Sequence, residues 1–313
     1  MKDSTVKLSE ILQYMQQEIG SLYPENEFRS IRRLVFERLT NIQPVDFHIK
    51  PNMEVPEEIF EKIKEIVEGL KIFKPLQYIL GTTNFLNLKL KVTPAVLIPR
   101  PETEELADWI IKNNKFNDNR ILDIGTGSGC LAIALDKLML NSQTDGIDIS
   151  DEALEIAEEN SYMNESICNF FHYNIFDGHN GKNSNLFKNN YDLIVSNPPY
   201  VCKSESAQMH KTVLEHEPHL ALFVEDNDPL IYYRAIADFA RIKLEWGGFL
   251  YLEINPKFEK ELIEMLTNKG FRNVQVRKDL SGKSRMIRAQ IKLFKSGENP
   301  ELENIRGLGL NKG

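Results

Sequence analysis

The chain has 313 residues, which is long enough for two domains. Apolar residues make up 42% and charged residues 27%, and this balance excludes a chain without a packed core, a collagen-like fibre and a small disulfide scaffold. Lysine and arginine total 38 against 46 aspartate and glutamate residues, so the formal net charge is −8. The overall charge therefore favours neither nucleic acid nor an anionic membrane as a direct partner.

The cysteines and the amino terminus give no sign of a metal site, a disulfide framework or a leader. Cys130, Cys168 and Cys202 are widely spaced, and the six histidines show no spacing typical of metal ligands. The first residues contain no apolar run typical of a signal peptide, and no segment approaches the roughly 20 apolar residues of a membrane span. We therefore expect a cytoplasmic protein with reduced thiols, no metal and no membrane attachment.

Apolar residues recur at helical spacing from Ser4 to about Leu70, which predicts a small helical domain over residues 1–74. This domain is either a cap on a larger domain or a docking domain for a partner. After Pro75 the pattern changes to alternation from Gln77 to Val92, which predicts a β-hairpin within a linker over residues 75–95.

Residues 96–295 are expected to form the second domain, because short apolar segments alternate there with helical stretches. This alternation predicts an α/β fold with a doubly wound parallel sheet and helices on both faces. The last helix, at 258–268, precedes two more strand candidates at 274–278 and 285–293, and the tail at 296–313 is expected to be disordered. The other expected strands lie at 120–124, 144–149, 169–172, 193–196 and 249–254, and the other helices at 130–140, 151–163 and 229–244.

A glycine-rich turn follows the first of these strands, with the sequence Gly125, Thr126, Gly127, Ser128 and Gly129. Glycines let the backbone approach a ligand closely, and the next helix presents free N–H groups. Asp148 stands 19 residues further on, where nucleoside-binding sheets hold ribose hydroxyls, although it could also cap a helix. A nicotinamide dinucleotide and S-adenosylmethionine both remain candidates, and the glycine spacing favours S-adenosylmethionine.

The fourth expected strand runs into Asn197, Pro198, Pro199 and Tyr200 at the edge where such sheets bind ligands. The Asn197 side-chain oxygen and the Pro198 carbonyl could each accept one N–H of a planar amide or an exocyclic amine. The prolines fix the backbone, and Tyr200 could stack over the planar group. The alternative is that Asn-Pro merely initiates a stiff turn.

This tetrapeptide resembles the Asn-Pro-Pro-Tyr motif of methyltransferases, and the chain is similar to the protein-(glutamine-N5) methyltransferases of the HemK/PrmC family. Further segments that carry the resemblance lie at 75–81, 97–105, 217–222 and 279–285. The resemblance implies a Rossmann-like class I methyltransferase sheet, with the helical domain joined to it by the hairpin. It also implies an enzyme that methylates the Gly-Gly-Gln glutamine of peptide chain release factors, with the helical domain as the docking domain. We expect the protein to be a monomer.

The same resemblance implies roles for particular residues. The glycine turn and Asp148 would hold S-adenosylmethionine, Asn174 and Ile175 would flank its adenine, and Asn197 would contact both cofactor and substrate. The whole tetrapeptide would hold the glutamine and form the catalytic site. Two positions differ from the family pattern, because Asn174 stands where an aspartate is usual and Asn255 where a glycine is common.

Several alternatives remain open from the sequence alone. The substrate could be a ribosomal-protein glutamine or a nucleic-acid amine, and the chain could be a binding module that has lost activity. The segment at 99–103 is either a solvated helix start or a wall of the active-site cleft. The polar segment at 178–190 is expected to be a surface loop.

Overall fold

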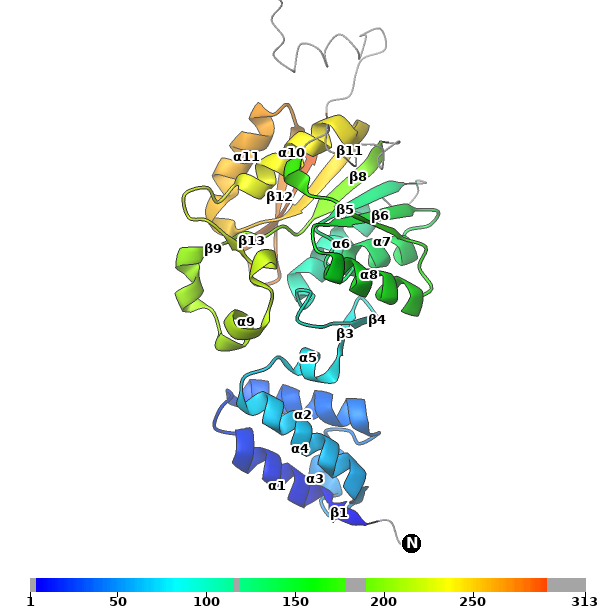
Figure 1. Cartoon of the computed structure of the whole chain (residues 1–313), viewed down its shortest axis with the longest axis vertical. Helices are drawn as coiled ribbons and strands as arrows, with labels where there is room; N and C mark the ends of the chain where they lie inside the picture. Colours follow the sequence, from blue (N-terminus) through cyan, green and yellow to red (C-terminus); the bar gives the residue numbers. More distant parts are fainter. Residues whose placement is uncertain (1–3, 115–118, 178–189, 292–313) are drawn as a thin grey trace, which may run out of the picture. The chain divides into compact units, whose positions relative to one another are not determined.

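The computed structural model describes residues 4–114, 119–177 and 190–291, which divide into two compact units (Figure 1). The first unit comprises Met1–Thr83, Lys91–Ile98 and Ala207–Pro218; the second comprises Asn84–Leu90, Pro99–Ser206 and His219–Gly313. The expected tail and almost all of the expected loop at 178–190 lie outside the described residues. In the described part of the chain, no helix has the length and apolar character needed to cross a membrane.

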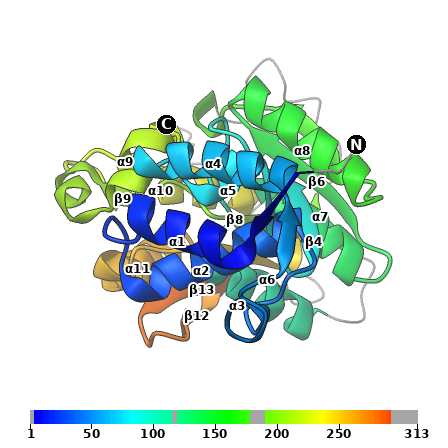
Figure 2. The same ribbon diagram turned by 90° about the horizontal axis from the view of Figure 1, so that it is seen from below.

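The first unit is helical, and α1, α2 and α4 lie side by side in it (Figure 2). Prolines precede α2 and α4, and glutamates occupy the first turns of both helices, where they complement the positive end of the helix dipole. Side chains three or four positions apart, such as Ile11 with Met15 and Ile63 with Val67, are buried in one apolar cluster. The elements are β1 (Thr5–Lys7), α1 (Leu8–Ile19), α2 (Glu25–Leu39), α3 (Asp46–Ile49), β2 (Glu54–Pro56), α4 (Glu57–Lys71) and α9 (Lys211–His216).

The segment after Pro75 differs in part from the expected hairpin. Residues Leu76–Leu80 form the short helix α5, which ends at Gly81 in a left-handed conformation. Leu76 and Tyr78 are both buried in this helix, Leu76 in the apolar cluster of the helical unit and Tyr78 with its hydroxyl donating to the Val96 carbonyl oxygen at 2.6 Å. The hairpin that follows consists of β3 (Thr82–Phe85) and β4 (Leu88–Lys91), and both of its turn residues have positive φ angles, which suits a tight hairpin turn.

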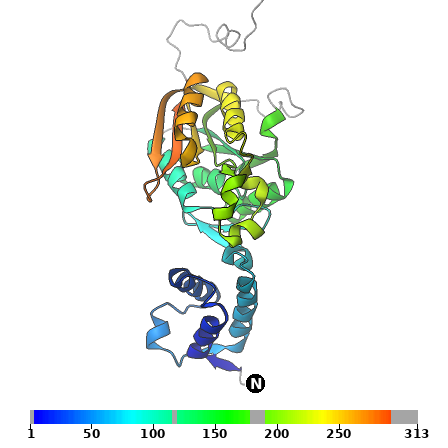
Figure 3. The ribbon, with the colours of Figure 1, turned by 90° about the vertical axis from the view of Figure 1, so that its left-hand side faces the viewer.

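The second unit contains a seven-stranded sheet in the order β12-β13-β11-β8-β5-β6-β7. The strands from the alternating segments, β11, β8, β5, β6 and β7, pair parallel as expected, whereas β13, from the two further strand candidates, runs antiparallel to both β11 and β12. A short turn joins β12 to β13, and strands joined in this way can only pair antiparallel (Figure 3). The strands are β5 (Arg120–Ile124), β6 (Gln143–Asp148), β7 (Asn169–His172), β8 (Tyr191–Ser196), β11 (Leu244–Glu253), β12 (Arg272–Lys278) and β13 (Ser284–Gln290).

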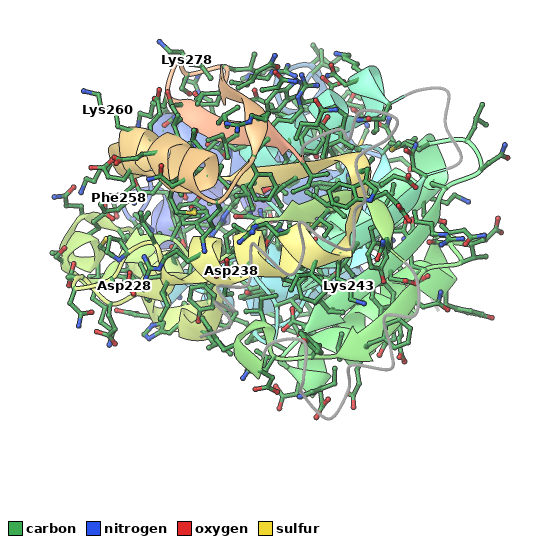
Figure 4. The ribbon with its side chains drawn as sticks, turned by 90° about the horizontal axis from the view of Figure 1, so that it is seen from above. Asp228, Asp238, Lys243, Phe258, Lys260 and Lys278 are labelled. Atoms are coloured by element: carbon green, nitrogen blue, oxygen red, sulfur yellow. The ribbon has the colours of Figure 1, made fainter. Side chains whose placement is uncertain are left out.

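Helices cover both faces of this sheet, as the alternating pattern predicts. On one face, α6 (Pro101–Asn113) and α7 (Cys130–Leu138) share an apolar cluster with the sheet, and α8 (Asp151–Met163) packs beside α7. On the other face lie α10 (Ile231–Lys243) and α11 (Glu259–Asn268), and Figure 4 shows them next to each other. The short strands β9 (Val201–Cys202) and β10 (Phe223–Val224) pair with each other outside this sheet.

The core of the helical unit generates a stability prediction. Ile63 on α4 is fully buried, so truncation in Ile63→Ala should leave a cavity and lower the free energy of unfolding by about 2–5 kcal/mol. Urea unfolding followed by far-ultraviolet circular dichroism measures the change. The matched control is Ile72→Ala in the same unit, because Ile72 is 61% exposed and its truncation should cost less than about 0.5 kcal/mol. Equal losses for the two variants would contradict this packing.

Candidate active site

The glycine turn connects β5 to α7 and leaves open space above its first two glycines. The N–H groups of Gly125 and Thr126 both donate to the Ile147 carbonyl oxygen, at 2.8 and 3.0 Å, which fixes the turn against β6. Gly125 and Gly127 have φ angles of 72° and 54°, and a Cβ on either residue would meet no atom within 4 Å. A ligand can therefore approach the backbone there.

The third glycine of the turn has a different reason to be small. A Cβ on Gly129 would lie 3.0 Å from Ile133 Cδ1 and 3.2 Å from Ala157 Cβ. Gly129 therefore allows α7 and α8 to pack closely, while the open space lies above Gly125 and Gly127.

Asp148 ends β6 with its carboxylate turned toward the glycine turn. Oδ2 accepts from the Gly127 N–H at 2.8 Å, and Oδ1 accepts from the Ser150 N–H at 3.0 Å. Burial raises the pKa of Asp148, and the backbone N–H donors partly oppose this. Ser150, not Asp148, caps α8, because its hydroxyl accepts from the Ala153 N–H. Asp148 thus keeps lone pairs for the hydroxyls of a ligand.

A second carboxylate, Asp123, lies buried beneath the same turn. Thr126 Oγ1 donates to Asp123 Oδ2 at 2.7 Å, whereas Oδ1 is buried and makes no well-formed hydrogen bond among the described residues, although the Ala132 N–H lies close enough to favour the charged carboxylate. Burial raises the pKa of Asp123 to about 7. An unpaired buried acceptor below an open glycine turn fits a ligand that carries N–H donors or positive charge, as S-adenosylmethionine does.

Asn174 and Ile175 follow β7 at the same edge of the sheet. The Tyr173 N–H donates to the Asp148 carbonyl oxygen at 2.9 Å, which holds this segment beside the end of β6. The Asn174 side chain is engaged in its own turn, since Oδ1 accepts from the Phe176 N–H and Nδ2 donates to Asp177 Oδ1. Asp177 therefore provides a carboxylate three residues after the position where the family usually has one.

The tetrapeptide directly follows β8 and is held at both ends. Asn197 Nδ2 donates to Thr103 Oγ1 at 3.1 Å, and the Tyr200 hydroxyl donates to Glu253 Oε1 at 2.9 Å. Thr103 Oγ1 in turn donates to Glu253 Oε2 at 2.7 Å. Asn197 and Tyr200 are therefore connected through one threonine and one carboxylate.

Glu253 ends β11 with only 1% of its surface exposed. Burial raises its pKa, while the hydrogen bonds from Thr103 and Tyr200 and the positive charge of Arg285 act in the opposite direction. Burial and the Glu253 carboxylate both raise the pKa of Tyr200, so its hydroxyl is protonated at neutral pH and donates. Arg285 lies 3.3 Å from the Asp279 carboxylate, which pairs its charge.

Asn255, two residues after Glu253, anchors the backbone of the tetrapeptide. Its Nδ2 donates to the Tyr200 carbonyl oxygen at 3.1 Å and to Glu205 Oε2 at 3.0 Å. Its N–H donates to the Tyr233 hydroxyl at 3.3 Å. A glycine, which is common at this position in the family, could not make the side-chain bonds.

The first turn of α6 contributes to the site and is more than a solvated helix start. Thr103 is 2% exposed and lies between Asn197 and Glu253. Glu104 Oε1 accepts from the Leu86 N–H in the hairpin turn at 3.1 Å, and Glu105 Oε1 accepts from the Leu280 N–H between β12 and β13 at 3.2 Å.

The residues singled out in the sequence therefore follow β5, β6, β7 and β8 at one edge of the sheet. Sequence reasoning gave no role to Asp123 or Glu253, and it included Thr103 only within the segment 99–103 as a possible wall of the cleft. A carboxylate at the end of an apolar strand was a usable signal for Asp123 and Glu253, but nothing in the sequence links Thr103 to Glu253, 150 residues away. Within the described ranges, no group of three or more histidine, cysteine or acidic side chains could hold a metal ion.

Comparison with known proteins gives two family matches, to the PrmC N-terminal domain at residues 10–81 and to the Methyltransferase small domain at residues 103–221. The release factor glutamine methyltransferase of Flavobacterium psychrophilum is 41% identical over 280 residues, which cover 88% of this chain and 96% of that protein. The enzyme of the same name from Bacteroides thetaiotaomicron is 39% identical over 284 residues, or 90% of this chain and 99% of that protein. The resemblance found in the sequence is confirmed.

Among solved structures, the hMettl16 catalytic domain in complex with MAT2A 3'UTR hairpin 6 superimposes with a TM-score of 0.53. The match covers 88% of this chain and 95% of that structure's chain at 13% identity, so the likeness concerns the fold alone.

The position of Asp148 generates a binding prediction. In Asp148→Asn the amide can accept from only one of its two backbone donors and carries no charge, so S-adenosylmethionine should bind about 10–100-fold more weakly. Isothermal titration calorimetry measures the dissociation constant. Asp151→Asn is the matched control, because Asp151 is exposed and pairs with His172. An unchanged affinity in Asp148→Asn would remove this carboxylate from the cofactor site.

Proposed function

The chain belongs to the release factor glutamine methyltransferase (HemK/PrmC) family, and on that premise we propose its substrate and the residues that act on it. It transfers a methyl group from S-adenosylmethionine to the side-chain amide nitrogen of the glutamine in the Gly-Gly-Gln motif of peptide chain release factors. It acts in the cytoplasm as a monomer, and the helical domain at residues 1–74 docks the release factor.

The cofactor is assigned to the glycine turn, Asp148 and the segment at 174–175. S-adenosylmethionine, when bound, supplies an electrophilic methyl group on a positively charged sulfur. The open space above Gly125 and Gly127 supports this assignment, because it leaves the backbone accessible to a ligand. Asp148 offers acceptors for ribose hydroxyls, and the buried carboxylate of Asp123 lies directly beneath the turn.

The reacting amide is assigned to the tetrapeptide at 197–200, and one observation carries this proposal. The Asn197 NH₂ group donates to Thr103, whereas its oxygen accepts no hydrogen bond from the described residues and is available to a substrate N–H. The Pro198 carbonyl accepts the second N–H, so both hydrogens of the glutamine amide are held and the nitrogen is oriented. The anchored Tyr200 presents its ring to the planar amide.

The alternative functions differ in their substrates, but all of them would use the same two hydrogen bonds to Asn197 and Pro198. A ribosomal-protein glutamine presents the same amide, and a nucleic-acid amine also presents two N–H groups. The net charge of −8 disfavours nucleic acid, which a protein usually binds through basic surfaces. A release factor is preferred because the relatives that cover about nine-tenths of the chain carry that substrate in their names.

The function is tested by peptide mass spectrometry of a release factor incubated with the protein and S-adenosylmethionine. We expect one added methyl group on the Gly-Gly-Gln glutamine and none on a release factor with alanine at that position. In Asn197→Ala, loss of the acceptor should lower turnover at least about 100-fold, while cofactor binding should be largely kept because the glycine turn and Asp148 remain. A methyl group found instead on a ribosomal protein or on RNA would show that the release factor is not the substrate. Full turnover by Asn197→Ala would show that Asn197 does not bind the substrate amide.

A further inference from the structure

The buried carboxylate of Glu253 imposes a direction on the hydrogen bonds that reach Asn197. An ionised carboxylate can only accept, so the hydroxyls of Thr103 and Tyr200 must both donate to it. A threonine hydroxyl has a single hydrogen, and Thr103 commits it to Glu253. Toward Asn197, Thr103 can therefore only accept.

This direction decides which end of the Asn197 amide faces away from Thr103. The oxygen and the NH₂ group of an asparagine are nearly equal in size, so packing alone does not distinguish the two orientations. Because Thr103 accepts, the NH₂ group points to Thr103 and the oxygen is presented to the substrate. In the opposite orientation the Asn197 NH₂ group would face the NH₂ group of the substrate, and two donors cannot bond to each other.

We propose that Glu253 and Thr103 are positioning residues, which act through Asn197 to keep an acceptor, and not a donor, facing the amide to be methylated. The inference rests on the proposed function, because it concerns the atom that would receive the substrate N–H. The same carboxylate holds the Tyr200 hydroxyl, so Glu253 fixes both ends of the tetrapeptide.

The surroundings of Glu253 isolate this network from water. Glu253 and Thr103 are 1% and 2% exposed, so solvent does not compete for their hydrogen bonds. The charged and titratable groups that act on Glu253 are Tyr200, Arg285 on β13 and Glu102 on α6, and the carboxylate acts in turn on Tyr233 of α10 and Cys130 of α7. Of these, Arg285 is the cation, and it favours the ionised carboxylate on which the direction depends.

The first test replaces Thr103 by two residues of similar size. Thr103→Val keeps the shape but removes the hydroxyl, and we expect its kcat to fall about 100-fold because the Asn197 amide loses both its fixed orientation and its exact position. Thr103→Ser restores the hydroxyl, and its kcat should stay within about five-fold of wild type. S-adenosylmethionine affinity should change less than about two-fold in both variants, which reports that the fold is retained. Normal turnover in Thr103→Val, or an equal loss in Thr103→Ser, would overturn the proposal.

The second test uses Glu253→Gln, which has the same shape but presents a donor to either Thr103 or Tyr200. The hydroxyl that meets this donor is no longer fixed, so one end of the tetrapeptide is released, and we expect kcat to fall about as much as in Thr103→Val. In the wild type, kcat should also fall as the pH is lowered through the raised pKa of Glu253, because the protonated carboxyl no longer accepts at both oxygens. That acid limb should be missing from the profile of Glu253→Gln. The same acid limb in both proteins would overturn the role of Glu253.

A measurement without substrate separates this proposal from the function on which it rests. The side-chain NH₂ resonances of Asn197 in ¹⁵N-labelled protein, assigned by their loss in Asn197→Ala, report the hydrogen bond to Thr103 directly. They should be unchanged in Thr103→Ser and shifted or broadened in Thr103→Val. If the release factor is not methylated but these resonances behave as expected, only the substrate is wrong. If methylation proceeds and the resonances do not respond to Thr103→Val, only the positioning is wrong.

Discussion

The site depends on one buried carboxylate that is shared by two hydroxyl donors. Glu253 binds Thr103 from α6 and Tyr200 from the segment after β8, and so joins three elements that are far apart in the sequence. Hydrogen bonds to a charged group contribute about 1.5–3 kcal/mol each, and an unpaired carboxylate at this depth would be strongly destabilising. The end of β11, the start of α6 and the tetrapeptide therefore have to come together for the fold to form around this charge.

The first turn of α6 connects the buried carboxylate of Glu253 to the turns around the site. Thr103 reaches the tetrapeptide, Glu104 binds the hairpin turn at Leu86, and Glu105 binds the turn between β12 and β13 at Leu280. Three consecutive side chains thus fix three separate segments. These three hydrogen bonds give a physical reason for a threonine followed by two glutamates in the motif at 97–105.

The cofactor half of the site could be predicted from the sequence, whereas the substrate half could be predicted only in part. The glycine turn and Asp148 follow strands whose apolar segments are plain in the sequence, and parallel strands bring their carboxyl ends to one edge. Asn197 likewise directly follows an apolar strand segment that is plain in the sequence. Its orientation depends on Thr103 and Glu253, which approach it only after the chain has folded.

The sequence by itself determined the family, the helical first segment, the α/β alternation and the positions of the strands at whose ends the site lies. These features follow from local periodicity and from motifs read along the chain. The tertiary structure decided the reversal of β13, the helix at 76–80 and the hydrogen-bond partners of Asn197 and Tyr200. The reason is that burial and hydrogen-bond direction depend on which distant segments come into contact. Local sequence patterns do not contain that information.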